Sequence, residues 1–321
     1  MELSSIRSVG RAQPCVLPQA LDGNQLGLIC QKSILRRPGN VAAYMSKVLE
    51  LFGYSSEAGT DWANVVRTQP CPYLERSCIK TRKSQPEIAI GTCSVAYGGQ
   101  NQNVIICPHR LLERRQVFLD CLHLLTRHEP GNELHVIAEI SIPGGSVDYV
   151  LVSARDEKIV DFVGIELQTM DTSGSVWSER QDFLRQRGLS IPDETFKKFG
   201  MNWKMTAKTI LVQLHHKIET FEHLGRHLAL VIQTPLETYM RREFNFAHVG
   251  QAKLGDSLHV HVYDLEHENA EYRLRLGQRW STDALGIAKA LGLQNEARVE
   301  FTELVRQLER KMSDRTRLQI G

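Results

Sequence analysis

Alternating apolar and polar residues predict three consecutive strands in the middle of the chain. These strands cover 134–141, 147–154 and 159–168, because the side chains of a half-buried strand face opposite sides of the sheet in turn. The connections at 142–145 and 155–158 are short enough for antiparallel hairpins. The pattern therefore predicts an antiparallel meander.

Further strands and helices are predicted on both sides of this meander. The apolar run at 227–233 is typical of a buried central strand, and 258–265 alternates like a half-covered strand. Helical spacing of apolar residues predicts helices at about 40–52, 110–127, 202–223, 282–291 and 296–312. This order of elements predicts an α/β fold, with a mixed sheet flanked by helices.

The composition is that of a folded globular protein. Apolar residues make up 42% and charged residues 24% of the 321 residues, and both values are near average. A disordered, collagenous or disulfide-dense chain is therefore excluded. The sequence has no uncharged apolar run of about 18 residues and no signal-peptide core near its start. We expect a cytoplasmic protein without a membrane span.

The charge distribution is uneven, although the net charge is only +2. Residues 128–175 hold nine acidic and two basic residues, and the remainder of the chain is basic. An acidic segment inside a basic chain suits a cation site surrounded by a surface that attracts polyanions.

Two carboxylates and an amide converge at one end of the predicted meander. Glu166 and Gln168 are two residues apart, so they project from the same face of the third strand. Pairing across the second hairpin sets Ala154 near Ile159, which leaves Asp148 beside Glu166 or Gln168. The sequence therefore predicts a cluster of oxygen ligands on neighbouring strands.

The chemistry of this cluster is that of a cation site. Converging carboxylates raise each other's pKa values unless a cation lies between them, and all-oxygen ligands favour Mg²⁺. Such a metal activates water and stabilises the charge that develops on a phosphodiester. Glu139, one strand back, is a possible additional carboxylate. The alternative is solvated strand ends, but Glu166 follows an apolar run, where an unpaired charge is costly.

Four cysteines cluster in a segment with little hydrophobic periodicity. Cys71, Cys78, Cys93 and Cys107 are separated by six, fourteen and thirteen residues. Four thiolates can close a tetrahedral site around zinc or iron, which stabilises a segment that has too small a core of its own. The alternative is four buried, unligated thiols. We expect that simpler role, as a core residue, for Cys121.

Taken together, these motifs resemble a family of nucleases. PGGSVDYVLV with Asp148, followed by Glu166-Leu167-Gln168, resembles the PD-(D/E)-X-K motif in its variant with Gln in place of the final Lys. Val147 stands where that motif has a proline. With CPYLERSC…GTC…IICP before it and VGIELQTMDTSGS within it, the segment at about 65–235 is similar to restriction endonucleases of the NotI type.

The resemblance implies a fold, metals and residue roles. It implies a PD-(D/E)-X-K nuclease-like mixed sheet with a four-cysteine metal-binding subdomain. Asp148 and Glu166 would bind catalytic Mg²⁺, Gln168 would position the attacking water, and the four cysteines would hold a structural iron, with zinc as the substitute. The implied enzyme is a homodimer that cuts double-stranded DNA at a palindromic, GC-rich site, without a membrane or a nucleotide cofactor.

This interpretation divides the chain into three parts. We expect an N-terminal arm and helix at 1–64, the four-cysteine subdomain at 65–109, and the catalytic core at 110–321 with a DNA-contacting insertion around 169–204. Two other functions fit the same sequence. One is a non-catalytic, metal-stapled DNA-binding protein, and the other is a structure-specific repair nuclease with the same core.

Basic residues interleave with Trp177 and Trp203 in the expected insertion. The DNA-binding candidates are Arg180, Arg185, Arg187, Lys204 and Lys208. A charged stretch is usually a solvated face, but beside a nuclease centre these residues are suited to contacts with phosphates and base edges.

Two groups of histidines are interpreted as core or surface residues. His215, His216 and His223 share one helix, and His259 and His261 share one strand face. Neither group has an acidic or thiol partner at a spacing suitable for a metal site.

Overall fold

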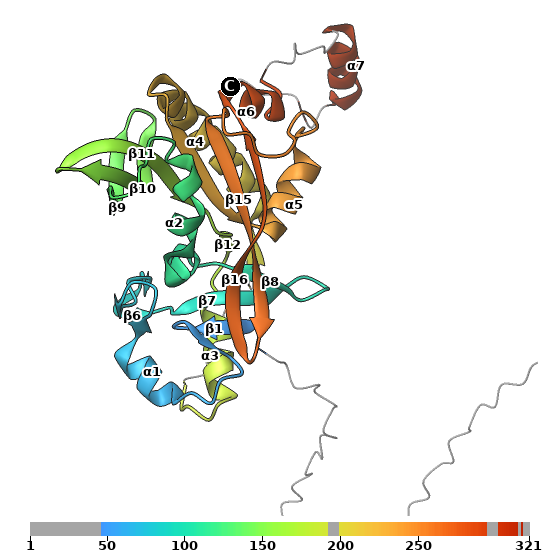
Figure 1. Cartoon of the computed structure of the whole chain (residues 1–321). Coiled ribbons are helices and arrows are strands. Elements are labelled where there is room, and N and C mark those ends of the chain that lie inside the picture. The colour runs from blue at the N-terminus through green and yellow to red at the C-terminus, as the bar shows by residue number, and fades with distance from the viewer. Residues whose placement is uncertain (1–45, 192–198, 294–300, 314–315, 317–321) are drawn as a thin grey trace, which may run out of the picture. The chain divides into compact units, whose positions relative to one another are not determined.

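The computed structural model of the protein describes residues 46–191, 199–293, 301–313 and 316. Its largest sheet is mixed and has six strands in the order β16-β15-β14-β11-β10-β9 (Figure 1). The strands are β9 (Glu133–Ile142), β10 (Gly145–Arg155), β11 (Lys158–Leu167), β14 (His227–Gln233), β15 (Leu258–Glu268) and β16 (Glu271–Thr282).

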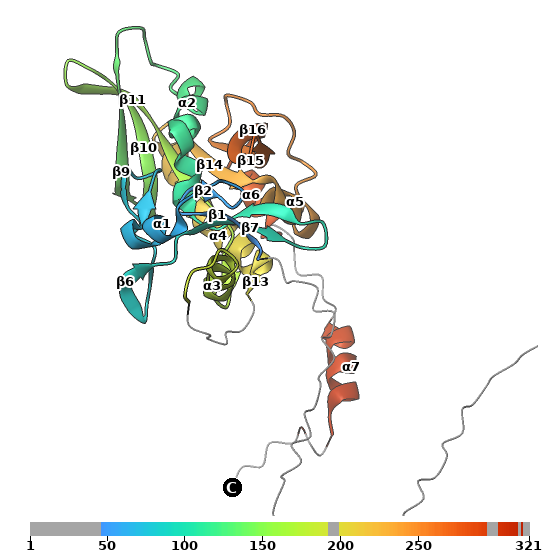
Figure 2. The same ribbon diagram turned by 90° about the horizontal axis from the view of Figure 1, so that it is seen from below.

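The strands of the predicted meander pair as expected. Antiparallel neighbours β9, β10 and β11 lie side by side (Figure 2), and Ala154 pairs with Ile159. Strand β14 pairs in parallel with both β11 and β15, which confirms that its apolar run marks a central strand. Strand β16, which the pattern did not predict, pairs antiparallel with β15.

Helix α4 (Trp203–His223) confirms the helix predicted at this place and packs on the central sheet. The same core cluster includes residues of α5 (Thr234–Glu243) and α6 (Ala284–Ala290). At Gly164 of β11, a Cβ atom would lie 2.3 Å from the ring of Phe221 on α4. The glycine therefore allows the helix to approach this strand closely.

Short helical turns, rather than the single long helix predicted there, contribute to a second core cluster. They are η1 (Pro108–Arg115), α2 (Gln116–Asp120) and η2 (Leu122–Leu124). Arg114 and Arg115 have φ angles of 50° and 56°, and such left-handed residues interrupt a right-handed helix. The prediction of one continuous helix was wrong, although the turns bury most of the apolar residues that suggested it.

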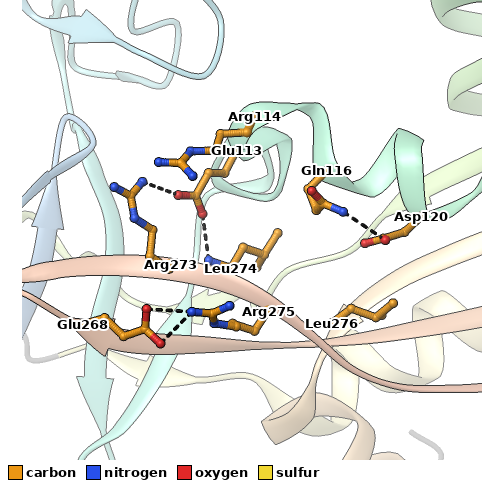
Figure 3. Close-up of a pocket in the computed structure, with 9 residues that line it drawn as sticks. All are labelled: Glu113, Arg114, Gln116, Asp120, Glu268, Arg273, Leu274, Arg275 and Leu276. Carbon is orange, nitrogen blue, oxygen red and sulfur yellow. Dashed lines mark hydrogen bonds and ion pairs between the residues drawn. The ribbon is translucent and has the colours of Figure 1, made fainter.

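A buried ion-pair network ties η1 to β1 and β16, and Figure 3 shows its contacts between η1 and β16. Arg110 is 1% exposed, and its guanidinium lies 2.8 Å from Glu50 and 2.9 Å from Glu113. Glu113 also accepts hydrogen bonds from the backbone N–H of Leu274 at 2.7 Å and from Arg273 at 3.0 Å. Burying these charges is tolerated because each has an ionic partner and further hydrogen bonds.

The part of the chain that carries the cysteines forms a second, four-stranded sheet, in the order β2-β1-β7-β8. The elements of this part are β1 (Val48–Leu51), β2 (Tyr54–Ser55), α1 (Trp62–Thr68), β3 (Pro70–Cys71), β4 (Arg76–Ser77), β5 (Thr81–Arg82), β6 (Gln85–Ala89), β7 (Thr92–Tyr97) and β8 (Gln102–Ile105). The helix predicted at 40–52 was wrong where it is described, because β1 lies there. Residues 40–45 lie outside the described residues.

Helix α3 (Trp177–Arg185) lies in the expected insertion and shares an apolar cluster with β1 and α1. Strands β12 (Thr172–Ser173) and β13 (Gly200–Met201) pair with each other on either side of it in the sequence. Helix α7 (Phe301–Lys311) agrees with the described part of the last predicted helix. Within the described ranges, no helix is both long and apolar enough to cross a membrane.

Candidate active site

Asp148 and Glu166 lie on neighbouring strands, one residue beyond the pair formed by Tyr149 and Ile165. Asp148 Oδ2 accepts a hydrogen bond of 2.8 Å from the backbone N–H of Leu167. Both acids are half-buried. The hairpin register thus brings the two carboxylates together, as the sequence predicts.

Glu166 has an ionic partner that the sequence reasoning missed. Lys217 Nζ of α4 lies 2.7 Å from Glu166 Oε1, and the two side chains are 9% and 15% exposed. Burial raises the pKa of Glu166 to about 7, and Asp148 also raises it, whereas Lys217 and a backbone hydrogen bond from Asp148 act in the opposite direction. The Glu166 carboxyl group therefore has little contact with water and lies between a positive and a negative side chain.

Gln168 follows β11 at the same end of the sheet. Its backbone N–H donates to Val231 O at 2.9 Å, which continues the pairing with β14. Its side-chain Nε2 donates to Thr169 O at 2.9 Å. The amide is half-buried and lies beyond the two acids along the strand.

Glu139 lies on the strand next to Asp148. The pairs formed by Val147 with Ile140 and by Tyr149 with Ala138 place Glu139 opposite Asp148. Glu139 is exposed and its φ angle is 56°, which departs from regular strand geometry. A third carboxylate, that of Glu139, therefore lies on β9 directly across from Asp148.

The four cysteines of the predicted metal site are free thiols that lie within electrostatic reach of one another. Burial raises the pKa of Cys107, and Cys78 and Cys71 raise it further. Burial also raises the pKa of Cys93, with Cys107 as the next cause. Cys71, Cys93 and Cys107 are buried, whereas Cys78 is half-buried. The four thiols therefore belong to one region of the second sheet and its ribbons.

Basic residues of the cysteine-bearing part act electrostatically on two residues that Asp148 also affects. Burial lowers the pKa of His109, Lys80 and Arg76 lower it further, and Asp148 acts in the opposite direction. Arg76 pairs with Cys71 in the β3–β4 ribbon and also lowers the pKa of Tyr149, next to Asp148. Positive charge from the cysteine-bearing part therefore acts on His109 and Tyr149, two residues on which the Asp148 charge also acts.

A group of three potential metal ligands lies on α4, outside both the carboxylate cluster and the cysteine region. Among the described residues, His215, His216 and Glu219 have ligand atoms that all lie within 4.8 Å of one another, whereas the cysteine sulfurs form no such group. Glu219 is an acidic partner that our interpretation of these histidines did not include. It lies 3.8 Å from His215 and 3.9 Å from His216, on the exposed part of α4.

The five basic candidates for DNA contact differ in exposure. Arg180 is 2% exposed and lies over the ring of Trp177 at 4.5 Å, and Arg187 lies over Phe183 at 3.5 Å. Arg185 forms an ion pair with Asp182 within α3. Lys204 and Lys208 of α4 are exposed. The packing gives the three arginines structural contacts, and leaves the two lysines accessible to solvent.

His259 and His261 are buried in β15, as expected for core histidines. The Cys121 thiol is also buried and lies 3.7 Å from His261 Nδ1, so this histidine has a thiol neighbour that we did not expect. Burial lowers the pKa of His259 to about 4 and that of His261 to about 3. Both imidazoles are neutral in the folded protein near neutral pH.

These two histidines make the fold sensitive to acid. Each is neutral when folded but binds a proton near pH 6.5 when unfolded, so the free energy of unfolding should fall as the pH drops below about 6.5. The expected slope is up to roughly 1.4 kcal/mol per pH unit for each histidine, continuing to about pH 4. Denaturant titrations between pH 7 and 4.5 should show a smaller slope for His261→Gln. An unchanged slope would mean that His261 does not titrate in this way.

A family comparison covers both groups of predicted site residues. The model of the family described as restriction endonuclease NotI matches residues 65–274, a range that includes the four cysteines, Asp148, Glu166 and Gln168. A search of curated proteins gave no match. Because the match spans well over half of the chain, it shows a site-specific deoxyribonuclease that acts on DNA. The chain belongs to the NotI family of restriction endonucleases.

Proposed function

We propose that this restriction endonuclease hydrolyses phosphodiester bonds of double-stranded DNA with Mg²⁺ held by Asp148 and Glu166. The observation that carries the proposal is the convergence of the two carboxylates on adjacent strands. Their donor set fits the ion, because Mg²⁺ prefers oxygen ligands and is bound through one or two carboxylates together with phosphates. Glu139, exposed and opposite Asp148, is the candidate for an additional ligand.

The protein residues divide the work by their chemistry. Bound Mg²⁺ would supply Lewis acidity toward the phosphate and lower the pKa of water. Asp148 and Glu166 would hold it, and the hydrogen bond from Leu167 to Asp148 fixes the orientation of one carboxylate. Gln168 would orient the attacking water, because an amide can hydrogen-bond but cannot take up a proton. The proton would then pass to solvent or to a neighbouring phosphate.

Metal-dependent cleavage is tested directly. The purified protein is incubated with plasmid and genomic DNA in Mg²⁺ or in EDTA, and the ends of the fragments are sequenced. The expected result is discrete fragments that share one end sequence and form only with Mg²⁺. We propose a palindromic, GC-rich site read by a homodimer, because a two-fold axis matches a palindrome. Binding without cleavage would instead support the DNA-binding alternative.

We further propose that Lys204 and Lys208 contact the DNA backbone. Both are exposed on α4, the helix that also carries Lys217 beside Glu166. Lysine neutralises phosphates without reading bases, so removing one should weaken binding about equally for all sequences. The contacts of Arg180, Arg185 and Arg187 within the protein support structural roles for these arginines.

The four-cysteine region is proposed to hold a structural iron, with zinc as the substitute. Neighbouring thiols raise the pKa values of Cys93 and Cys107, which shows that the cysteines lie near one another. Thiolate ligands suit iron and zinc. Strands β3 to β6 have only two to five residues each, too short to be stable by themselves. A closed four-thiolate site would stabilise them and would leave no open position for catalysis.

Replacement of a proposed ligand should lower metal content and stability together. Cys107→Ser is expected to lose most of the bound metal, measured by elemental analysis, and to unfold at a lower temperature. Cys121→Ser is the matched control, since Cys121 is also buried but lies in a core cluster that contains none of the four proposed ligands. Equal metal content in wild type and Cys107→Ser would contradict the proposal.

A further inference from the structure

Lys217 occupies an unusual position for a lysine. The buried residues of α4 include Ile210, Leu214, Lys217 and Phe221, so the lysine lies on the apolar stripe of the helix. It is the one buried lysine among the described residues. Burying an ammonium group is costly unless a partner compensates it, and the partner is Glu166 at 2.7 Å. The ion pair with Glu166 therefore explains why a lysine can be buried at this position.

The surroundings of Lys217 fix its path to the site. The turn between β9 and β10 lies against α4, because a Cβ at Gly144 would be 3.1 Å from the backbone of His216. A Cβ at Gly145 would be 3.4 Å from Lys217 Cε. Thr220 Oγ1 donates to Pro143 O at 2.9 Å and ties the turn to the helix. The lysine stem thus passes under this turn and ends at Glu166.

We propose that Lys217 is a positioning residue of the endonuclease active site, which holds Glu166 for binding the catalytic metal. Each of the two carboxylates then has one oxygen fixed by the protein, Asp148 Oδ2 by the Leu167 N–H and Glu166 Oε1 by Lys217. Gln168 brings no charge to the site, so the positive charge beside the acids comes from α4. This inference rests on the proposed metal-dependent function.

The position of Lys217 also argues against a direct contact with DNA. Its side chain is 9% exposed and its ammonium is engaged by Glu166. Lys204 and Lys208, on the same helix, are exposed. A lysine that acts through Glu166 affects the metal requirement and the rate of hydrolysis, whereas a phosphate contact affects DNA affinity. The two roles are therefore separable by measurement.

The test compares Lys217→Met with Lys217→Arg and with Lys289→Met. Lys289 is exposed on α6 and has no role in the site, so its variant controls for loss of a charge from a helix. Single-turnover cleavage is measured against Mg²⁺ concentration, and DNA affinity is measured with Ca²⁺ in place of Mg²⁺. Lys217→Met is expected to lower the rate about 10- to 100-fold and to raise the Mg²⁺ concentration for half-maximal rate, at unchanged DNA affinity.

Several outcomes would overturn the inference. If folded Lys217→Met cleaves like wild type at every Mg²⁺ concentration, Lys217 does not position Glu166. The same conclusion follows if the variant loses DNA affinity while its cleavage rate is unchanged. Lys217→Arg keeps the charge and should recover part of the lost rate, and no recovery contradicts a positioning role. If Lys217→Met does not fold, Lys217→Gln is measured with the same expectation. Failure of the proposed function is distinct, since the wild type would then not cleave DNA with Mg²⁺, or Glu166→Ala would cleave like the wild type.

Discussion

Glu166→Ala is expected to lower the single-turnover rate of DNA cleavage by about 10³-fold or more, because it removes a carboxylate that holds the proposed catalytic metal. The substitution leaves the backbone pairing of β11 with β10 and β14 in place. DNA affinity measured with Ca²⁺ should therefore change far less than the rate. Radiolabelled duplexes that carry the cleavage site would provide both measurements.

Glu133→Ala provides the matched control for this prediction. Glu133 is an exposed acid at the start of β9, whose carboxylate lies 3.4 Å from His135 rather than near Glu166. Its removal should leave the cleavage rate unchanged. A purified, folded Glu166→Ala protein that cleaves at the wild-type rate would refute the role of this carboxylate, and with it the proposed metal site.

Arg110→Met is expected to lower the free energy of unfolding by about 3–5 kcal/mol, since it leaves the buried Glu50 without its cation and removes one of the two cations that contact Glu113. Glu50 lies within 2.8 Å of the arginine, and Glu113 within 2.9 Å. The Glu50 and Glu113 side chains are only 3% and 11% exposed, so little water reaches either carboxylate. Urea denaturation followed by circular dichroism would measure the loss.

A second arginine of the same network provides the comparison. Arg273 contacts Glu113 at 3.0 Å but is 33% exposed, so Arg273→Met should cost no more than about 1 kcal/mol. Similar losses for the two variants would show that burial does not decide the strength of this network. If Arg110→Met does not fold, Arg110→Lys keeps a charge and is expected to lose stability while remaining measurable.

The meander and the meeting of Asp148 with Glu166 could be predicted because hairpin register is a local property. Two short connections and a period of two residues determine which side chains are neighbours. The short strands around the cysteines could not be predicted, since two to six residues carry too little periodicity. Strand β16 was missed although charged and apolar residues alternate regularly from Glu271 to Leu276, which is the pattern of a half-buried strand.

The remaining failures have a tertiary origin. The left-handed residues Arg114 and Arg115 break a helix that the apolar spacing favours, and no glycine marks the break. Lys217 was missed because its partner is 51 residues away in the sequence. A signal was nevertheless present, since Ile210, Leu214 and Phe221 define a stripe in which a lysine is out of place. A charge on an apolar stripe is best interpreted as a partner for a buried acid.

The close approach of α4 to β11 at Gly164 connects core packing with the chemistry of the enzyme. Phe221, which fills the space above the glycine, is one helical turn after Lys217. Any side chain at Gly164 that pushed the helix outward would also draw the ammonium away from Glu166. If Lys217 positions Glu166 as proposed, a substitution at Gly164 should therefore disturb catalysis as well as packing. Under that proposal, the spacing between α4 and β11 sets the distance from the ammonium group to the carboxylate.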